Sequence, residues 1–196
     1  MRNHAIMAKT LRTALNGYAP KRITDLGAGD GHFLTRVAKK VSPRWPGVSV
    51  TLVDNQKVMS SQALALFTPL GWRVELVEAD VLEWLSAATG LDVVVANLFL
   101  HHFEDPQLAK LFRAIADRAR LLVAIEPHRA PWPLFCCRLL WAIGCNSVTR
   151  HDAAISVRAG FSGQELSALW PKDGGWQLTE RRTGLFSHLF VAERMD

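Results

Sequence analysis

The stretch Ile23-Thr24-Asp25-Leu26-Gly27-Ala28-Gly29-Asp30-Gly31-His32-Phe33 decides the fold of this 196-residue chain. A short apolar run, which predicts a strand, leads into a glycine-rich turn and then into a segment with helical spacing. Gly27 and Gly29 can adopt backbone angles closed to other residues and carry no Cβ, so a ligand can lie against the main chain at the helix N-terminus. Asp25 adds a carboxylate beside the turn. Strand, turn and helix in this order predict a ligand site.

The residues of the turn limit the kind of ligand. A dinucleotide fingerprint reads G-x-G-x-x-G, but its last position here is His32, and the final glycine comes one place early, at Gly31. No lysine follows in the place that a P-loop requires. Asp25 and Asp30 would repel a pyrophosphate, and they suit a cationic or zwitterionic ligand that carries hydroxyl groups.

Read from Asp25 to Gly31, the turn has the form D-x-G-x-G-x-G. In this form it resembles the first motif of the class I S-adenosylmethionine-dependent methyltransferases. The resemblance implies that Asp25, Gly27, Ala28 and Gly29 contact S-adenosyl-L-methionine, which becomes S-adenosyl-L-homocysteine once its methyl group is transferred. The alternative is a glycine turn that only packs a helix against a sheet.

Strand and helix patterns alternate along the chain after this turn. We expect strands at 23–26, 48–54, 72–78, 92–97 and 120–125, and helices at 33–41, 55–67, 81–88 and 106–118. A helix within residues 1–20, ending near Gly17, precedes them. This alternation predicts an α/β, Rossmann-like doubly wound sheet that is mostly parallel and has helices on both faces.

The tail of the chain has a different pattern. A helix is expected over 162–170, with Ser162 as its cap, followed by strands at 176–182 and 187–193. Only four residues join these last strands, so they must form an antiparallel hairpin. The seven-stranded sheet that results is the architecture that the methyltransferase resemblance implies. With 196 residues and 49% hydrophobic content, the whole chain, 1–196, is expected to form a single domain.

Polar residues follow several of the predicted strands, and in a parallel sheet ligands bind beyond these strand ends. Asp54 follows the second strand with Asn55 beside it. Its carboxylate can accept hydrogen bonds from both hydroxyls of a ribose; the alternative is a surface acid that caps the next helix. Asp80 and Val81 follow the third strand. The resemblance implies that they meet the adenine, although Asp is also an ordinary helix N-cap.

The segment Asn97-Leu98-Phe99-Leu100-His101-His102-Phe103 follows the fourth strand. It resembles the fourth motif of small-molecule methyltransferases related to the quinone-biosynthesis enzymes, which implies cofactor contacts from Asn97 and Leu98. A hydroxyl acceptor loses its proton when it is methylated, and His101 or His102 could be the base because imidazole titrates near neutral pH. Either histidine could instead pack beside the cofactor. The Asn/Asp-Pro-Pro-aromatic motif frequent in nucleic-acid methyltransferases is absent here.

An insertion follows the fifth strand, at 127–161, where acceptor-binding segments lie in this fold. Its stretch 133–145 is almost entirely apolar but too short to span a bilayer, which takes about 20 residues. We expect a lid or wall over an acceptor pocket, with a buried core helix and a peripheral membrane contact as alternatives. The residues expected to contact the acceptor are Glu126, His128, Arg129, Trp132, Trp141, Arg150 and His151.

Composition restricts the remaining classes of function. The net charge of +5 could indicate nucleic-acid binding, but the basic residues are scattered along the chain. Three cysteines form neither a disulfide framework nor a zinc-binding pattern, and the seven dispersed histidines indicate no metal site. Residues 1–10 lack the apolar core of a signal peptide, so we expect a cytoplasmic protein.

The sequence favours methyl transfer from S-adenosylmethionine to a small, aromatic or quinone-like apolar molecule, at oxygen or carbon. Two alternatives stay open. One is an RNA methyltransferase, whose binding would depend steeply on salt. The other is a cofactor-binding module without catalysis that acts through a protein partner. The identity of the acceptor and the oligomeric state stay open as well.

Overall fold

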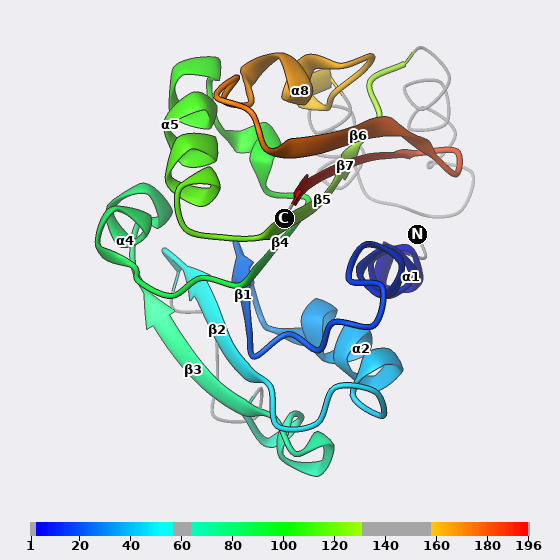
Figure 1. Ribbon diagram of the computed structural model, residues 1–196, viewed down its shortest axis with the longest axis vertical. Coiled ribbons are helices and arrows are strands. Elements are labelled where there is room, and N and C mark those ends of the chain that lie inside the picture. The colour runs from blue at the N-terminus through cyan, green and yellow to red at the C-terminus, as the bar shows by residue number, and fades with distance from the viewer. Residues whose placement is uncertain (1–2, 57–63, 131–157, 196) are drawn as a thin grey trace, which may run out of the picture.

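A single mixed sheet organises the protein. The computed structural model describes residues 3–56, 64–130 and 158–195, and in this part of the chain the strands follow the order β3-β2-β1-β4-β5-β7-β6 (Figure 1). β1 to β5 are parallel, whereas β7 pairs antiparallel with both β5 and β6. The strands are β1 (Arg22–Leu26), β2 (Ser49–Asp54), β3 (Arg73–Glu78), β4 (Val93–Asn97), β5 (Leu121–Pro127), β6 (Trp176–Thr183) and β7 (Ser187–Arg194). The predicted fold, including its C-terminal hairpin, is confirmed.

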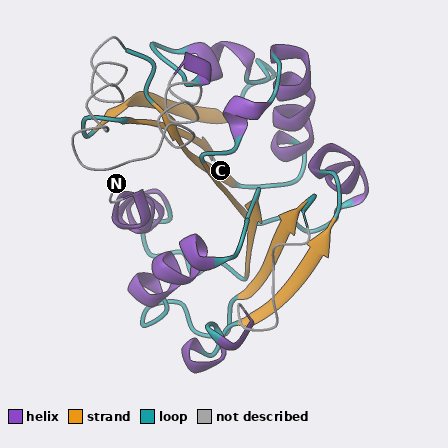
Figure 2. Cartoon of the chain, turned by 180° about the vertical axis from the view of Figure 1, so that it is seen from behind, coloured by secondary structure: helices purple, strands orange, loops and turns teal. Residues whose placement is uncertain are grey.

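Helices cover both faces of the sheet (Figures 1 and 2). α1 and α2 pack on one face, and α4, α5 and α8 pack on the other. The described helices are α1 (Asn3–Ala14), α2 (His32–Val41), α4 (Val81–Ala87), α5 (Asp105–Ala116) and α8 (Glu165–Leu169), with 3-10 turns at η1 (Thr68–Leu70) and η2 (Leu100–His102). The predicted three-layer, doubly wound arrangement is therefore present.

The apolar patterns explain these layers. The residues of β5, and those of β4 up to Ala96, are buried, as expected for central strands that are covered on both faces. In α2 the buried residues Leu34, Val37, Ala38 and Val41 recur at helical spacing and face the sheet. α5 begins with a capping box between Glu104 and Gln107, which satisfies backbone N–H groups at its first turn.

Several element boundaries differ from the prediction. β5 continues to Pro127 instead of ending at 125, because the antiparallel partner β7 pairs with it as far as Ser187. α8 begins at Glu165, and its N-cap is Gln164 and not Ser162, whose N–H and hydroxyl instead bond the Glu165 carboxylate. α1 ends at Ala14 and a turn follows. Most of the helix predicted at 55–67 lies outside the described residues.

Strand order fixes where a ligand can bind. The chain moves from β1 outward to β2 and β3, then returns to the other side of β1 with β4 and β5. The carboxyl ends of β1 and β4 therefore lie at a topological switch point, where open α/β sheets bind ligands. The two ends of the predicted insertion also meet here, since His128 bridges to Phe161.

Candidate functional site

The glycine turn joins β1 to α2 at the switch point. The N–H groups of Gly27 and Ala28 both donate to the carbonyl of Val53 at the end of β2, over 2.9 and 3.1 Å. Gly27 and Gly29 have positive φ angles of 66° and 54°, a conformation that favours glycine. A Cβ on Gly27 would overlap the ring of Phe99, whereas a Cβ on Gly29 would meet nothing within 4 Å. Gly27 thus permits packing inside the protein, and Gly29 leaves space for a ligand.

Asp54 ties this turn to the end of β2. Its Oδ2 accepts a hydrogen bond from the Gly29 N–H over 2.8 Å, and its Oδ1 accepts one from the Gln56 N–H over 2.9 Å. A carboxylate has about four acceptor positions, so each oxygen can accept one more bond. Asp54 is only half-buried and borders a cavity. It can therefore shape the turn and still bind the hydroxyl groups of a ligand.

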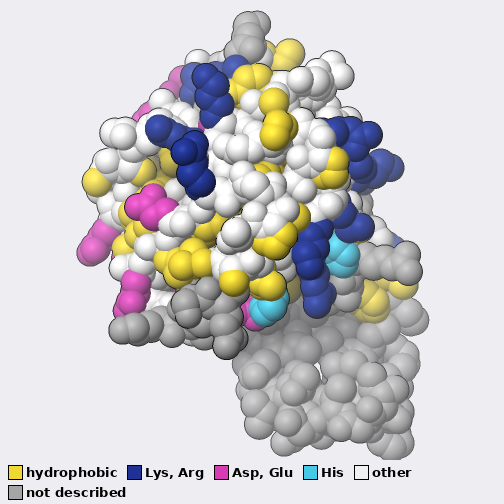
Figure 3. All heavy atoms as spheres, turned by 90° about the horizontal axis from the view of Figure 1, so that it is seen from below, with side chains coloured by type: hydrophobic (Ala, Val, Ile, Leu, Met, Phe, Trp, Pro, Cys, Tyr) yellow, Lys and Arg dark blue, Asp and Glu magenta, His cyan; other side chains and the backbone are white. Residues whose placement is uncertain are grey.

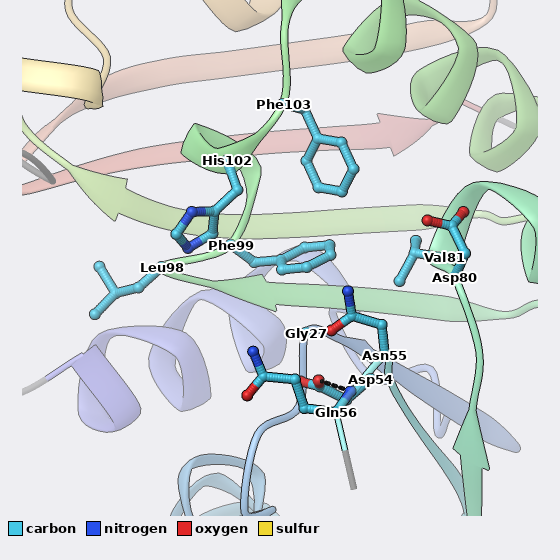
Figure 4. Close-up of a pocket in the computed structure, with 10 residues that line it drawn as sticks. All are labelled: Gly27, Asp54, Asn55, Gln56, Asp80, Val81, Leu98, Phe99, His102 and Phe103. Carbon is cyan, nitrogen blue, oxygen red and sulfur yellow. Dashed lines mark hydrogen bonds between the residues drawn. The ribbon is translucent and has the colours of Figure 1, made fainter. Parts of the chain in front are cut away.

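The cavity beside Asp54 has a volume of about 380 Å³, within the usual range for small-molecule sites. In Figure 4 the side chains of Asp54, Asn55 and Gln56 lie along one side, and Phe99, Phe103 and His102 lie opposite. The Phe99 and Phe103 rings pack edge to face with centroids 5.0 Å apart. The complete lining is Gly27, Asp54, Asn55, Gln56, Asp80, Val81, Leu98, Phe99, His102 and Phe103. One wall is thus polar and the other aromatic, which suits a nucleoside.

Asp80 lies at the cavity and also caps α4, the two places that its expected roles require. It borders the cavity, and its Oδ1 accepts hydrogen bonds from the N–H groups of Leu82 and Glu83 over 2.8 and 3.1 Å, which caps α4. Val81, the first residue of α4, borders the same cavity beside it. The start of α4 therefore places a carboxylate and an aliphatic surface at one end of the cavity.

Asp25 lies beneath the turn and does not border the cavity. Its side chain in β1 is buried, and its Oδ2 has no hydrogen-bond partner among the described residues. Burial, with a further contribution from the negative charge of Asp54, raises the pKa of Asp25 to about 8. The carboxyl group therefore holds its proton at neutral pH. The predicted contact between Asp25 and the cofactor stays a prediction.

Asn97 connects the end of β4 to the N-terminal helix. Its Oδ1 accepts a hydrogen bond from Asn3 Nδ2 over 2.9 Å, and Asn3 Oδ1 accepts one from the Ser187 hydroxyl over 3.0 Å. Leu98 follows with a positive φ of 55° and is 38% exposed. It borders both the first cavity and a neighbouring one of about 400 Å³. That second cavity is lined by Asn3, His4, His32, Phe33, Arg36, Asn97 and Leu98.

The two adjacent histidines lie in different surroundings. His102 borders the first cavity, while the His101 side chain is only 5% exposed and its Nδ1 lies 2.7 Å from Glu126 Oε2. The rings contact each other with centroids 4.2 Å apart. Burial lowers the pKa of His102, His101 lowers it further, and Glu126 works in the opposite direction. His102 is therefore neutral near pH 7 and able to accept a proton at the cavity wall.

The residues predicted to contact the acceptor lie in different surroundings. Glu126 is 1% exposed and bonds within the protein. His128 stacks on His188 with ring centroids 5.9 Å apart, and burial, followed by the neighbouring His188 and Arg182, lowers the pKa of His128. Arg129 pairs with Glu165 on the surface. Trp132, Trp141, Arg150 and His151 lie outside the described residues.

Sequence reasoning missed several residues of this edge of the sheet. Gln56, Phe99 and Phe103 border the cavity although none was singled out. The spacing of the two phenylalanines around the histidine pair was the available signal for an aromatic wall. A buried ion pair between His188 and Glu180, 2.8 Å long, was also missed. Its signal was a histidine directly before the apolar residues 189–192 of β7.

Two classes of site are not found in residues 3–56, 64–130 and 158–195. These residues contain no group of three or more His, Cys, Asp or Glu side chains that could hold a metal ion. Among their helices, none is both long enough and apolar enough to cross a bilayer.

Comparison with known sequences points to one family. Residues 23–120 match a family model described as "Methyltransferase domain". The trans-aconitate 2-methyltransferase of Streptomyces avermitilis is 35% identical over 83 residues, which are 41% of this chain and 29% of that protein. The O-methyltransferase xanE of Aspergillus fumigatus is 27% identical over 110 residues, 56% of this chain and 23% of that protein. The match thus spans less than a third of the length of either relative.

Solved structures show the same fold. The plantazolicin methyltransferase BamL, in complex with SAH and a triazolic desmethylPZN analog, superposes with a TM-score of 0.71 at 12% identity, covering 98% of this chain and 85% of that one. Magnesium protoporphyrin IX methyltransferase from Synechocystis, with bound SAH, gives a TM-score of 0.62 at 14% identity over 98% and 82% of the two chains. At these identities the likeness establishes the fold.

Proposed function

Because this chain belongs to the methyltransferase-domain family, we propose that it transfers a methyl group from S-adenosyl-L-methionine to a small, largely apolar acceptor, at oxygen or carbon. The observation that carries this proposal is the cavity at the switch point. Asp54 lies on one of its walls and the Phe99 ring on the other, and the glycine turn closes its base. This combination of acceptor oxygens, aromatic surface and exposed backbone suits an adenosine better than a phosphate-bearing nucleotide.

The residues present fit the cofactor in detail. Asp54 would accept hydrogen bonds from the ribose hydroxyls with its remaining lone pairs, and Phe99 and Val81 would contact the adenine. Open space beside Gly29 leaves room for the chain that leads to the amino-acid end. In the neighbouring cavity, His32 and Arg36 provide a basic surrounding for its carboxylate. When bound, the cofactor supplies a methyl group on a positively charged sulfur.

His102 is the base in this proposal. Its imidazole borders the cavity and is neutral near pH 7, because burial and the adjacent His101 lower its pKa. An acceptor that is methylated at oxygen or carbon would release a proton. His102 takes the proton that the acceptor releases. General-base assistance of this kind contributes roughly 10²- to 10⁴-fold to a rate.

The surroundings of His102 support a small acceptor. Leu98, Phe99 and Phe103 give this side of the cavity an apolar surface. The names of the relatives describe O-methyl transfer and methylation of trans-aconitate, so carboxylic acids belong beside phenols among the candidates. On the face shown in Figure 3, Lys and Arg side chains form separate groups divided by hydrophobic and uncharged surface, unlike the continuous basic stripe that RNA binding uses.

The test combines binding with transfer. Calorimetry should show that the protein binds S-adenosylmethionine and S-adenosylhomocysteine. Methyl-labelled cofactor should then label one class within a panel of phenols, quinols, small carboxylic acids and total RNA. Absence of cofactor binding, or labelling of RNA alone, would overturn the proposal. Binding without transfer to any member of the panel would support a module that acts through a partner.

A further inference from the structure

Glu126, buried near the end of β5, accepts several hydrogen bonds from the segment that follows β4. Its Oε1 accepts hydrogen bonds from the N–H groups of Phe99 and Leu100 over 3.0 and 2.9 Å. Its Oε2 lies 3.4 Å from the His101 backbone nitrogen and 2.7 Å from His101 Nδ1. Three successive N–H groups thus converge on one carboxylate, an arrangement that binds anions in other proteins. Here the anion is part of the protein itself.

The same segment contains the strained residue of the site. Leu98 has a φ of 55°, in the left-handed region, which costs a branched residue roughly 1–2 kcal/mol. Its own N–H donates to the Ile125 carbonyl over 2.8 Å. The N–H groups of residues 98 to 101 are therefore all directed at Ile125 and Glu126 of β5. Strain of this kind persists only where surrounding contacts determine the conformation.

We propose that Glu126 is the positioning residue of this site: its buried carboxylate holds residues 98–101 in the strained conformation that places Phe99 and His102 on the cavity wall. Phe99 then packs against Gly27, whose missing Cβ leaves room for the ring. Neither Phe99 nor His102 could keep its place if the segment relaxed. This inference rests on the proposed function only where turnover is measured.

Glu126 also determines which nitrogen of His101 carries the proton. An ionised carboxylate can only accept, so His101 Nδ1 must donate, which leaves Nε2 without a proton in the neutral ring. His101 is held in this form directly against the His102 ring. The ionisable groups that act on His102 are His101 and Glu126. Removal of the Glu126 charge should therefore move the pKa of His102 further down.

A graded series of variants tests the proposal. Glu126→Gln keeps an oxygen for Phe99 and Leu100 but presents an amide NH2 group to His101, whereas Glu126→Ala removes every bond. We expect turnover to fall roughly 10- to 100-fold in Glu126→Gln and further in Glu126→Ala. Cofactor affinity should fall less than turnover in Glu126→Gln, because the Asp54 bonds are kept although Phe99, the proposed adenine contact, can shift. The acidic limb of the pH–rate profile should move to lower pH.

Glu180→Gln is the matched control. Glu180 is also buried, accepts hydrogen bonds from two backbone N–H groups, of Leu166 and Ser167, and pairs with a histidine, His188. It is not part of the cavity lining. We expect Glu180→Gln to lower the melting temperature about as much as Glu126→Gln while turnover stays within about 2-fold. Equal losses of turnover in the two variants would overturn the proposal.

Two further measurements need no activity. Nitrogen-15 NMR should detect a protonated His101 Nδ1 in the wild type and its loss in Glu126→Gln; unchanged signals would contradict the proposal. Leu98→Gly should relieve backbone strain in the wild type, where Glu126 holds the positive φ, and should therefore be more favourable there than in a Glu126→Ala background, where the segment can relax. Additive effects would show that Glu126 does not hold Leu98. These two results stand even if no acceptor is methylated, so failure here and failure of the proposed function are distinguishable.

Discussion

The two halves of the ligand-binding edge are built by different means. In the cofactor half, formed by the ends of β1, β2 and β3, Asp54 and Asp80 each bond an N–H group two residues further along the chain. In the acceptor half, formed by the ends of β4, β5 and β7, Glu126 bonds residues that lie 25 to 27 positions away. The first half combines these local turns with one long-range bond, from the Gly29 N–H to Asp54. The second half exists only when the strands are in register.

Substitutions in the two halves should have different effects. A substitution in the cofactor half should act mainly on affinity, because each turn is proposed to contact the ligand directly. In the acceptor half a substitution should act mainly on turnover, because the buried carboxylate acts through the segment that it holds. Four predictions, in order of decreasing effect, can break or sharpen this distinction.

Gly27→Val should have the largest effect, since Gly27 is the point where the two halves touch. The valine side chain would overlap the Phe99 ring, and a branched residue is strained at a φ of 66°. We expect loss of measurable cofactor binding by calorimetry and destabilisation by about 2–4 kcal/mol in urea. Gly47→Ala, at a φ of 71° with open space around the position, is the control for strain alone. Binding as tight as in the control would contradict the packing described here.

His102→Ala should affect turnover alone. We expect kcat to fall by at least about 100-fold with cofactor affinity within about 3-fold, because the imidazole is the proposed proton acceptor. His101→Ala should instead act through the position of the segment and lower stability as well, since its Nδ1 is bonded to the buried Glu126. Single-turnover kinetics and thermal unfolding distinguish the His102→Ala variant from the His101→Ala variant. A full rate in His102→Ala would remove the base assignment.

Asp54→Ala should affect affinity alone. It removes the bond that holds Gly29 together with the proposed ribose contacts, so cofactor affinity should weaken by about 2–4 kcal/mol with kcat at saturation nearly unchanged. Asp30→Ala is a close control, because Asp30 also accepts a hydrogen bond from an N–H two residues on, that of His32, but is not part of the cavity lining. Titration calorimetry on both variants measures the cofactor affinity of each. Equal affinities would mean that the ribose lies elsewhere.

The same difference explains what the sequence could reveal. Asp54 and Asp80 could be predicted because each follows a predicted strand, and ligands bind beyond the carboxyl ends of parallel strands. Glu126 was predicted to contact the acceptor because it borders the insertion expected after the fifth strand; in the structure its carboxylate bonds the N–H groups of Phe99 and Leu100. Nothing in the sequence pairs residue 126 with residue 99. That contact depends on the register between β4 and β5 and on the positive φ of Leu98.

Asp25→Asn should have the smallest effect on cofactor binding and turnover at neutral pH, where both side chains are uncharged, and its consequence appears in the pH dependence of stability. Asp25 has a pKa of about 8 in the folded protein against 3.8 in an unfolded chain. Between these values the native state holds a proton that the unfolded state has lost, so stability should fall as pH rises, by up to about 1.4 kcal/mol per unit.

The asparagine variant carries no such proton, so urea unfolding at pH 5, 6, 7 and 8 should give the wild type a steeper decline than Asp25→Asn. The variant should be the more stable protein at pH 8 and above, where the wild type must bury a charge beside Asp54. Parallel curves would show that the Asp25 carboxyl reaches solvent or a partner once the protein is in solution. The charge on Asp25 would favour a ligand that brings a positive group to the glycine turn, so cofactor affinity of the wild type, but not of Asp25→Asn, should increase as the pH rises through about 8.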